Sequence, residues 1–219
     1  KIFASDNPDI LARFLTKDIS SEQMQSEIDK VLKVENKGKK IEIEFGNKAD
    51  IYRDYELLLP ENMSIEVKAF NGSIQIVGIK SRINVEAMNG NIEILDVVGS
   101  VSAKSLNGNI IAKMLLDGQS DFTTANGSID ILIKDNYSVP LSARTATGAI
   151  NLIIPQGYSA DIDAVSVSGS IRCDIPIERE DKPKPVFSIG GLKGKIFGGG
   201  PPLKLATVSG NIDIRLDRE

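Results

Sequence analysis

Two aspartates separated by a single residue are the first candidates for chemistry. Asp161 and Asp163 flank Ile162 in a stretch where apolar and polar residues alternate. On a β-strand, residues two apart point to the same side and lie roughly 7 Å from each other, so the two carboxylates could hold a cation or act as an acid pair. The alternative interpretation is a pair of solvated surface carboxylates.

A second group of charged residues interrupts the alternating pattern between Ile175 and Val186. Charge and proline together predict a surface loop there. Because insertions in repeat proteins often lie on a binding face, the loop is a candidate partner-binding site, with a self-neutralised, solvated loop as the alternative. Its charged residues are Glu178, Arg179, Glu180, Asp181 and Lys182.

The composition excludes several kinds of active site. The 219 residues contain no histidine, which excludes histidine-based nucleophile activation and zinc sites built from imidazole. Cys173 is the single cysteine, and its inward position in the pattern described below predicts a buried, inert thiol. Gly190 to Ile196 resembles a phosphate-binding loop, but the glycine spacing is one residue short and Ile196 replaces the required Ser or Thr. We therefore expect no cofactor, no metal site and no enzymatic activity.

Composition and charge also restrict the protein class. Hydrophobic residues make up 41% of the chain and charged residues 26%, which is typical of a soluble globular protein. No run approaches the roughly 18 apolar residues of a membrane-spanning helix. The net charge of -4 argues against a nucleic-acid partner, since such proteins need a basic surface for the phosphate backbone.

The elements that carry these residues are internal repeats. A phrase of the form Asn-Gly-Asn/Ser-Ile occurs four times and then continues in four looser copies. A recurrence every 16 to 25 residues is typical of stacked repeats. The repeated glycines are Gly72, Gly90, Gly108, Gly127, Gly148, Gly169, Gly194 and Gly210.

Each copy is predicted to be a strand, a tight turn and a second strand. All eight copies have isoleucine two residues after the glycine, and apolar residues mostly recur at every second position on both sides. Asn-Gly is also a strong hairpin signal, but the fixed period favours parallel stacking over an antiparallel meander. We therefore predict an all-β fold, a single-stranded β-solenoid (β-helix or β-roll) of about eight coils over residues 61–219.

Residues 1–60 follow another pattern and are predicted to form an N-terminal α/β cap over the end of the stack. A helix is expected to begin near Ser20, with Met24, Ile28, Val31 and Leu32 on one face. Short strands are expected at residues 1–5, 10–16, 31–35, 40–45 and 52–59.

The repeat phrases resemble the bacterial DUF4097 family of proposed adhesins. The similarity covers about residues 31–217 and includes Phe70 to Ile74, Met88 to Ile92, Leu106 to Ile110 and the run from Gly198 to Ile212. The resemblance implies a β-solenoid exported beyond the cytoplasmic membrane, either periplasmic or at the cell surface. It supplies no functional residues.

The leading hypothesis is therefore a non-enzymatic cell-surface or periplasmic interaction module, an adhesin with a protein or glycan partner. One alternative is a structural scaffold that self-associates end to end through its solenoid. Another is a carbohydrate-active β-helix enzyme that uses Asp161 and Asp163.

Overall fold

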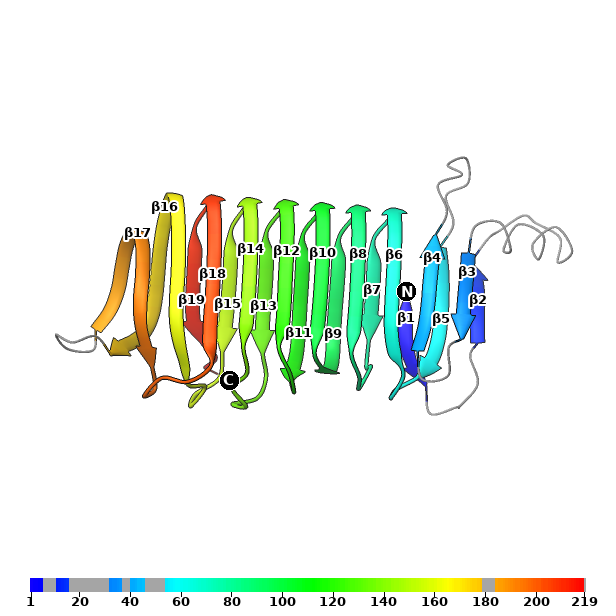
Figure 1. Cartoon of the computed structure of the whole chain (residues 1–219), viewed down its shortest axis with the longest axis horizontal. Helices are drawn as coiled ribbons and strands as arrows, with labels where there is room; N and C mark the ends of the chain where they lie inside the picture. The colour runs from blue at the N-terminus through cyan, green and yellow to red at the C-terminus, as the bar shows by residue number, and fades with distance from the viewer. Residues whose placement is uncertain (6–10, 16–31, 37–39, 46–53, 179–183, 219) are drawn as a thin grey trace, which may run out of the picture.

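The computed structural model describes residues 1–5, 11–15, 32–36, 40–45, 54–178 and 184–218. All regular elements in these ranges are strands, and they form one 19-stranded sheet wound into an elongated stack (Figure 1). Neighbouring strands run parallel over most of the stack. The expected all-β class is confirmed, and the arrangement is that of a β-solenoid.

One side of the stack is a ladder of parallel strands that end at the repeated turns. Pairing runs from β4 through β6, β8, β10 and β12 to β14, in register at equivalent repeat positions. The strands are β4 (Lys40–Phe45), β6 (Ser64–Asn71), β8 (Ile83–Asn89), β10 (Val101–Asn107), β12 (Ser120–Asn126) and β14 (Leu141–Thr147).

A second parallel ladder begins directly after the turns and forms the other side. It runs from β1 through β7, β9, β11 and β13 to β15. The strands are β1 (Ile2–Ser5), β7 (Ile74–Val77), β9 (Ile92–Gly99), β11 (Ile110–Leu116), β13 (Ile129–Ile133) and β15 (Ile150–Ile154).

The hydrophobic core lies between the two ladders. The isoleucines that follow the turn glycines are direct partners across strands, with Ile92 paired to both Ile74 and Ile110. Ile92 and Ile110 are fully buried. The predicted parallel stacking is therefore confirmed for these coils. The isoleucines form one buried column, and burial of each side chain contributes about 1.5–3 kcal/mol to stability.

Buried hydroxyl groups join five of the turns to a neighbouring coil. The hydroxyl three residues before a turn glycine donates to the glycine carbonyl of the adjacent coil, as from Thr124 to Gly108 (2.9 Å) and from Thr145 to Gly127 (2.9 Å). These carbonyls would otherwise be buried acceptors without a partner, which costs about 1–3 kcal/mol each.

The C-terminal coils do not stack in sequence order. The last coil consists of β18 (Pro202–Ser209) and β19 (Ile212–Leu216). It lies between the coil of β14 and β15 and the long strand β16 (Ala160–Glu178), which contributes to both ladders. Figure 1 shows both chain termini within the row of strands rather than at its ends. The regular repeats predicted that all eight coils stack in sequence order, and that prediction is wrong.

The seventh repeat in the sequence is not a coil. Strand β17 (Lys184–Ile196) runs antiparallel to β16, so Gly194 is paired with Ile162 in the middle of a strand. Its phrase has lysines on both sides of Gly194 and Gly198 at the later inward position. The physical reason is that the short polar side chain (Asn, Thr or Ser) found before the glycine at the other seven copies is replaced by the long cationic side chain of Lys193, which does not fit a tight column of turns. The copy therefore lacks the groups that define a stacked turn.

The N-terminal strands continue the stack. β1 pairs in parallel with both β7 and β5 (Asp54–Pro60), and β2 (Leu11–Leu15) pairs antiparallel with β5. β3 (Leu32–Asn36) pairs antiparallel with β4, and strands were expected at both places. The expected helix falls on residues 20–31, which lie outside the described residues, and Leu32 begins a strand.

Candidate binding surfaces

A ladder of asparagine side chains follows the edge of the stack at the turns. Asn89 donates its Nδ2 hydrogen to Asn71 Oδ1 (2.9 Å), Asn107 donates to Asn89 (2.8 Å), and Asn126 donates to Asn107 (2.9 Å). All four side chains are exposed. The turn asparagines therefore form a continuous row of side-chain amides joined by hydrogen bonds.

A second polar column lies two residues further along and fixes the backbone of the turns. Ser73 Oγ accepts from the Asn91 backbone N–H (3.3 Å), and Asn91 Oδ1 accepts from the Asn109 N–H (2.9 Å). Asn109 Oδ1 accepts in the same way from Ser128 (2.8 Å). Because these side chains hold the next coil, the turn edge is a rigid polar strip.

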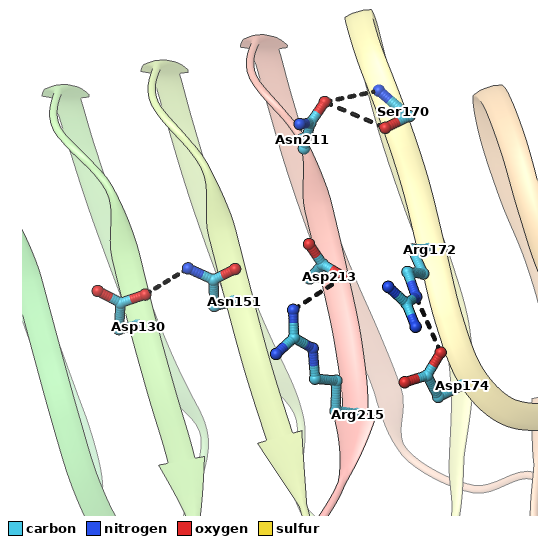
Figure 2. A network of polar contacts seen from close by, with 8 residues as sticks. All are labelled: Asp130, Asn151, Ser170, Arg172, Asp174, Asn211, Asp213 and Arg215. Carbon is cyan, nitrogen blue, oxygen red and sulfur yellow. Dashed lines mark hydrogen bonds and ion pairs between the residues drawn. The ribbon is translucent and has the colours of Figure 1, made fainter.

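Polar rows continue from this strip onto the outer face of the second ladder (Figure 2). Asn151 donates to Asp130 Oδ1 (2.6 Å), and in strand register Asn151 is next to Asp213, which is next to Arg172. The row of amide, carboxylate and guanidinium groups gives this face both donors and acceptors for polar ligands.

Two ion pairs flank that row within single strands. Arg172 Nε lies 3.0 Å from Asp174 Oδ1, and Arg215 lies 3.4 Å from Asp213 Oδ1. The second contact makes no hydrogen bond, and Asp213 Oδ1 is buried without a hydrogen-bond partner. Both arginine side chains are more than half exposed, so the stability that each pair contributes is small, about 0–1 kcal/mol.

The outer face of the first ladder differs, because it carries an exposed apolar column. The position two residues before each turn glycine is apolar in every coil. A shallow hollow of about 750 Å³ lies over the middle of this column, between Leu106 and Val208. In spatial order the column is Phe70, Met88, Leu106, Ala125, Ala146, Val208 and Val167. The sequence prediction missed this feature, although its repeat position made it readable.

The structure places Asp161 and Asp163 on β16, between β17 and β18, with different partners. Asp161 Oδ1 accepts from the Gly200 backbone N–H (3.2 Å), whereas Asp163 Oδ2 forms an ion pair with Lys193 of β17 (3.0 Å). Among the described residues, no three or more Asp, Glu, Cys or His side chains gather to hold a metal ion.

The charged loop is only partly described. Glu178 ends β16, and its Oε1 accepts from the Gly198 backbone N–H (3.1 Å). Arg179, Glu180, Asp181 and Lys182 lie outside the described residues. The prediction of a partner-binding loop therefore stays a prediction.

Cys173 packs in the core as expected. It is 1% exposed, its strand partner is Ile214, and its thiol lies 3.5 Å from the Ile175 carbonyl oxygen. Burial raises the pKa of the Cys173 thiol to about 11, which keeps it protonated at neutral pH.

The comparisons with known proteins give little further information. No family model and no curated protein matches the chain. A solved structure from Clostridium sporogenes, named a "putative cell adhesion protein", is similar over 99% of this chain and 86% of that chain, with 14% identity and a TM-score of 0.40. Membership of DUF4097 stays a prediction. Among the described residues, no helix is long and apolar enough to cross a membrane.

Proposed function

We propose that this chain is a non-enzymatic adhesin, periplasmic or at the cell surface, that binds an extended glycan along its asparagine ladder. The observation that carries this proposal is the row of joined amides from Asn71 to Asn126. The extracytoplasmic location is supported by the resemblance of the repeats to DUF4097.

The hydrogen-bonding capacity of the ladder supports a ligand rich in hydroxyl groups. A side-chain amide has two N–H donors and an oxygen with two lone pairs. An inner rung such as Asn89 uses one donor and one lone pair within the ladder. One donor and one acceptor therefore face outward at each rung, repeated at the strand spacing of about 4.8 Å. A linear polymer with regularly spaced hydroxyls can match such a row.

Rigidity is the second supporting argument. The adjacent column accepts backbone N–H groups of the next coil, so the strip is ordered before any ligand arrives. A preorganised surface loses less conformational entropy on binding, which raises the affinity gained from each contact.

A glycan array followed by titration of the best ligand tests the proposal. The variant Asn89→Ser with Asn107→Ser removes two inner rungs but keeps a residue type that other turns use, as at Ser168 and Ser209. We expect at least about tenfold weaker binding by a protein that circular dichroism shows to be folded. Lys113→Ser, at an exposed position of β11, is the matched control.

Two outcomes contradict the proposal. One is that the folded protein binds no glycan on a broad array; the other is that the double variant binds as tightly as Lys113→Ser. A protein captured from envelope or host extracts, with binding unaffected by the double variant, would move the function to another surface.

A structural scaffold is the second candidate function, and the outermost strand favours it. Among the described strands, β17 pairs only with β16 and lies at the outer end of the row, where another chain could add a strand (Figure 1). Electron microscopy at increasing concentration tests this candidate: filaments support it, and particles of fixed length contradict it.

A further inference from the structure

We infer that the apolar outer face of the first ladder is the interface of a symmetric dimer, in which a second copy of this chain packs face to face with its stack axis reversed. The interface comprises the outward residues of β6, β8, β10, β12, β14 and β18. It lies on a different surface from the asparagine ladder and does not depend on glycan binding.

Side-chain size along the apolar column is the first argument. The first half of the column carries the large side chains Phe70, Met88 and Leu106, which are 39%, 41% and 45% exposed. The second half begins with Ala125 and Ala146, which line the hollow. The large side chains of the first half therefore project from the face, and the two alanines of the second half lie lower.

A two-fold axis parallel to the strands, between β10 and β12, matches these halves. It places Leu106 of one copy opposite Ala125 of the other, and Met88 opposite Ala146. Phe70 then faces Val208. In a two-fold interface every contact occurs twice, so one surface supplies both the projecting and the receding half.

Charge supplies a second, independent argument at the position two residues earlier. The same axis places Glu86 of one copy opposite Arg144 of the other. Arg144 is exposed and has no hydrogen bond or ion pair with any described residue. Glu86 is held by Lys104 at 3.6 Å on the same face. In the dimer the Arg144 side chain of each copy faces Glu86 of the other copy, so this pair occurs twice, once toward each end of the interface.

The other face-to-face arrangement fits poorly. An axis along the stack places each coil opposite its own copy with the strand direction reversed. When this axis passes through the apolar column, Leu106 meets Leu106 and Ala125 meets Ala125. Large side chains then collide while the alanines face an empty space.

The area is sufficient for a stable dimer. Six strands at about 4.8 Å spacing, each with about seven residues at about 3.3 Å, give a face of roughly 29 by 23 Å. This is roughly 650 Å² for each copy, close to the approximately 800 Å² that each partner contributes to a standard interface.

Sedimentation velocity over a concentration series tests the inference, with variants chosen at exposed positions. We expect a monomer–dimer equilibrium that Leu106→Lys weakens at least about tenfold. Ile111→Lys is the matched control, because Ile111 is equally exposed (41%) but lies on the outer face of the other ladder. Circular dichroism confirms that both variants remain folded.

Two rescue experiments test the proposed pairing itself. Glu86→Arg and Arg144→Glu should each weaken the dimer, and the double variant should restore it to within about threefold of the wild type. Leu106→Ala with Ala125→Leu moves the projecting side chain across the axis and should likewise restore the dimer. Association that survives Leu106→Lys overturns the inference, and so does a strict monomer at high concentration. Failure of both rescues overturns the reversed arrangement.

Discussion

The coils from β6 to β15 and the coils from β16 to β19 are built from the same phrases but are assembled differently. In the first region every coil lies on the one before it in the sequence. In the second region β16 does not lie directly on the coil of β14 and β15. The chain returns through β17, which is antiparallel to β16, and the last coil (β18 and β19) then lies between β16 and the coil of β14 and β15. The repeat alone does not determine the stacking order.

The reason lies in what a repeat encodes. Each strand presents small or branched apolar side chains at the same inward positions, so β14 offers the same complementary edge to β16 as to β18. Thr147, Ser209 and Ser168 occupy one column in consecutive coils of the stack. Register is specified by such columns, because a slip by one residue would turn the apolar residues outward. The place of a coil in the stacking order is not specified in this way.

Disulfide trapping should give the largest effect, because the two possible orders give opposite results. Thr147→Cys with Ser209→Cys joins adjacent strands at about 4.8 Å, within the 4.4–6.8 Å range of disulfide Cα distances. Thr147→Cys with Ser168→Cys spans two strand spacings, about 9.6 Å, and should not close. Peptide mapping after mild oxidation measures both. A closed bond in the second variant would show that β16 lies directly on β14.

The sequence was sufficient to predict the strands and their inward columns. The alternation around Ile92 and Ile110 is a local signal, since each residue reports its own burial. The antiparallel course of β17 was not predicted, because strand direction depends on the strand with which a segment pairs and not on the local alternation of side chains. Even so, the lysines around Gly194 differed visibly from the asparagines of the other turns.

Alanine substitution at a turn glycine should give the next largest effect. A Cβ atom at Gly127 would lie 2.2 Å from the Gly108 carbonyl oxygen, so Gly127→Ala forces adjacent coils apart and should cost about 3 kcal/mol or more. Gly198, in the link to the last coil, has no described atom within 4 Å of such a Cβ. Gly198→Ala should cost only about 1 kcal/mol, from its φ of +86°. Urea denaturation measures both; equal losses would contradict close stacking at the turns.

The candidate site residues show the same division between local and distant information. The common face of Asp161 and Asp163 follows from their spacing on one strand. Their partners Gly200 and Lys193 do not, because those residues lie 39 and 30 positions further along the chain. The apolar column from Phe70 to Val167 was readable from its repeat position, but exposed apolar residues look like core residues until the strand faces are assigned.

Alkaline pH should lower the unfolding free energy through ionisation of Cys173, which lies in the second region. The same inward column has Ile131 and Leu152 in the sequential coils, and neither can ionise. The thiol pKa rises from 9.0 to about 11 on folding, so the stabilisation is complete below pH 9 and is lost as pH rises from 9 to 11. Relative to Cys173→Val, the wild type should lose about 2–3 kcal/mol of unfolding free energy over that interval. Parallel curves for the two proteins would mean that the thiol is solvated.

The smallest expected effect compares one hydrogen bond in both regions. Thr124 donates to Gly108 O (2.9 Å) in a sequential coil, and Thr207 donates to Gly148 O (3.0 Å) in the inserted coil. Both side chains are buried, so Thr124→Val and Thr207→Val should each cost about 1–2 kcal/mol by leaving a glycine carbonyl unsatisfied. Equal shifts in the urea midpoint mean that the inserted coil unfolds together with the rest of the stack. A shift confined to Thr124→Val would mean that the last coil opens separately, as a unit of lower stability at the end of the chain.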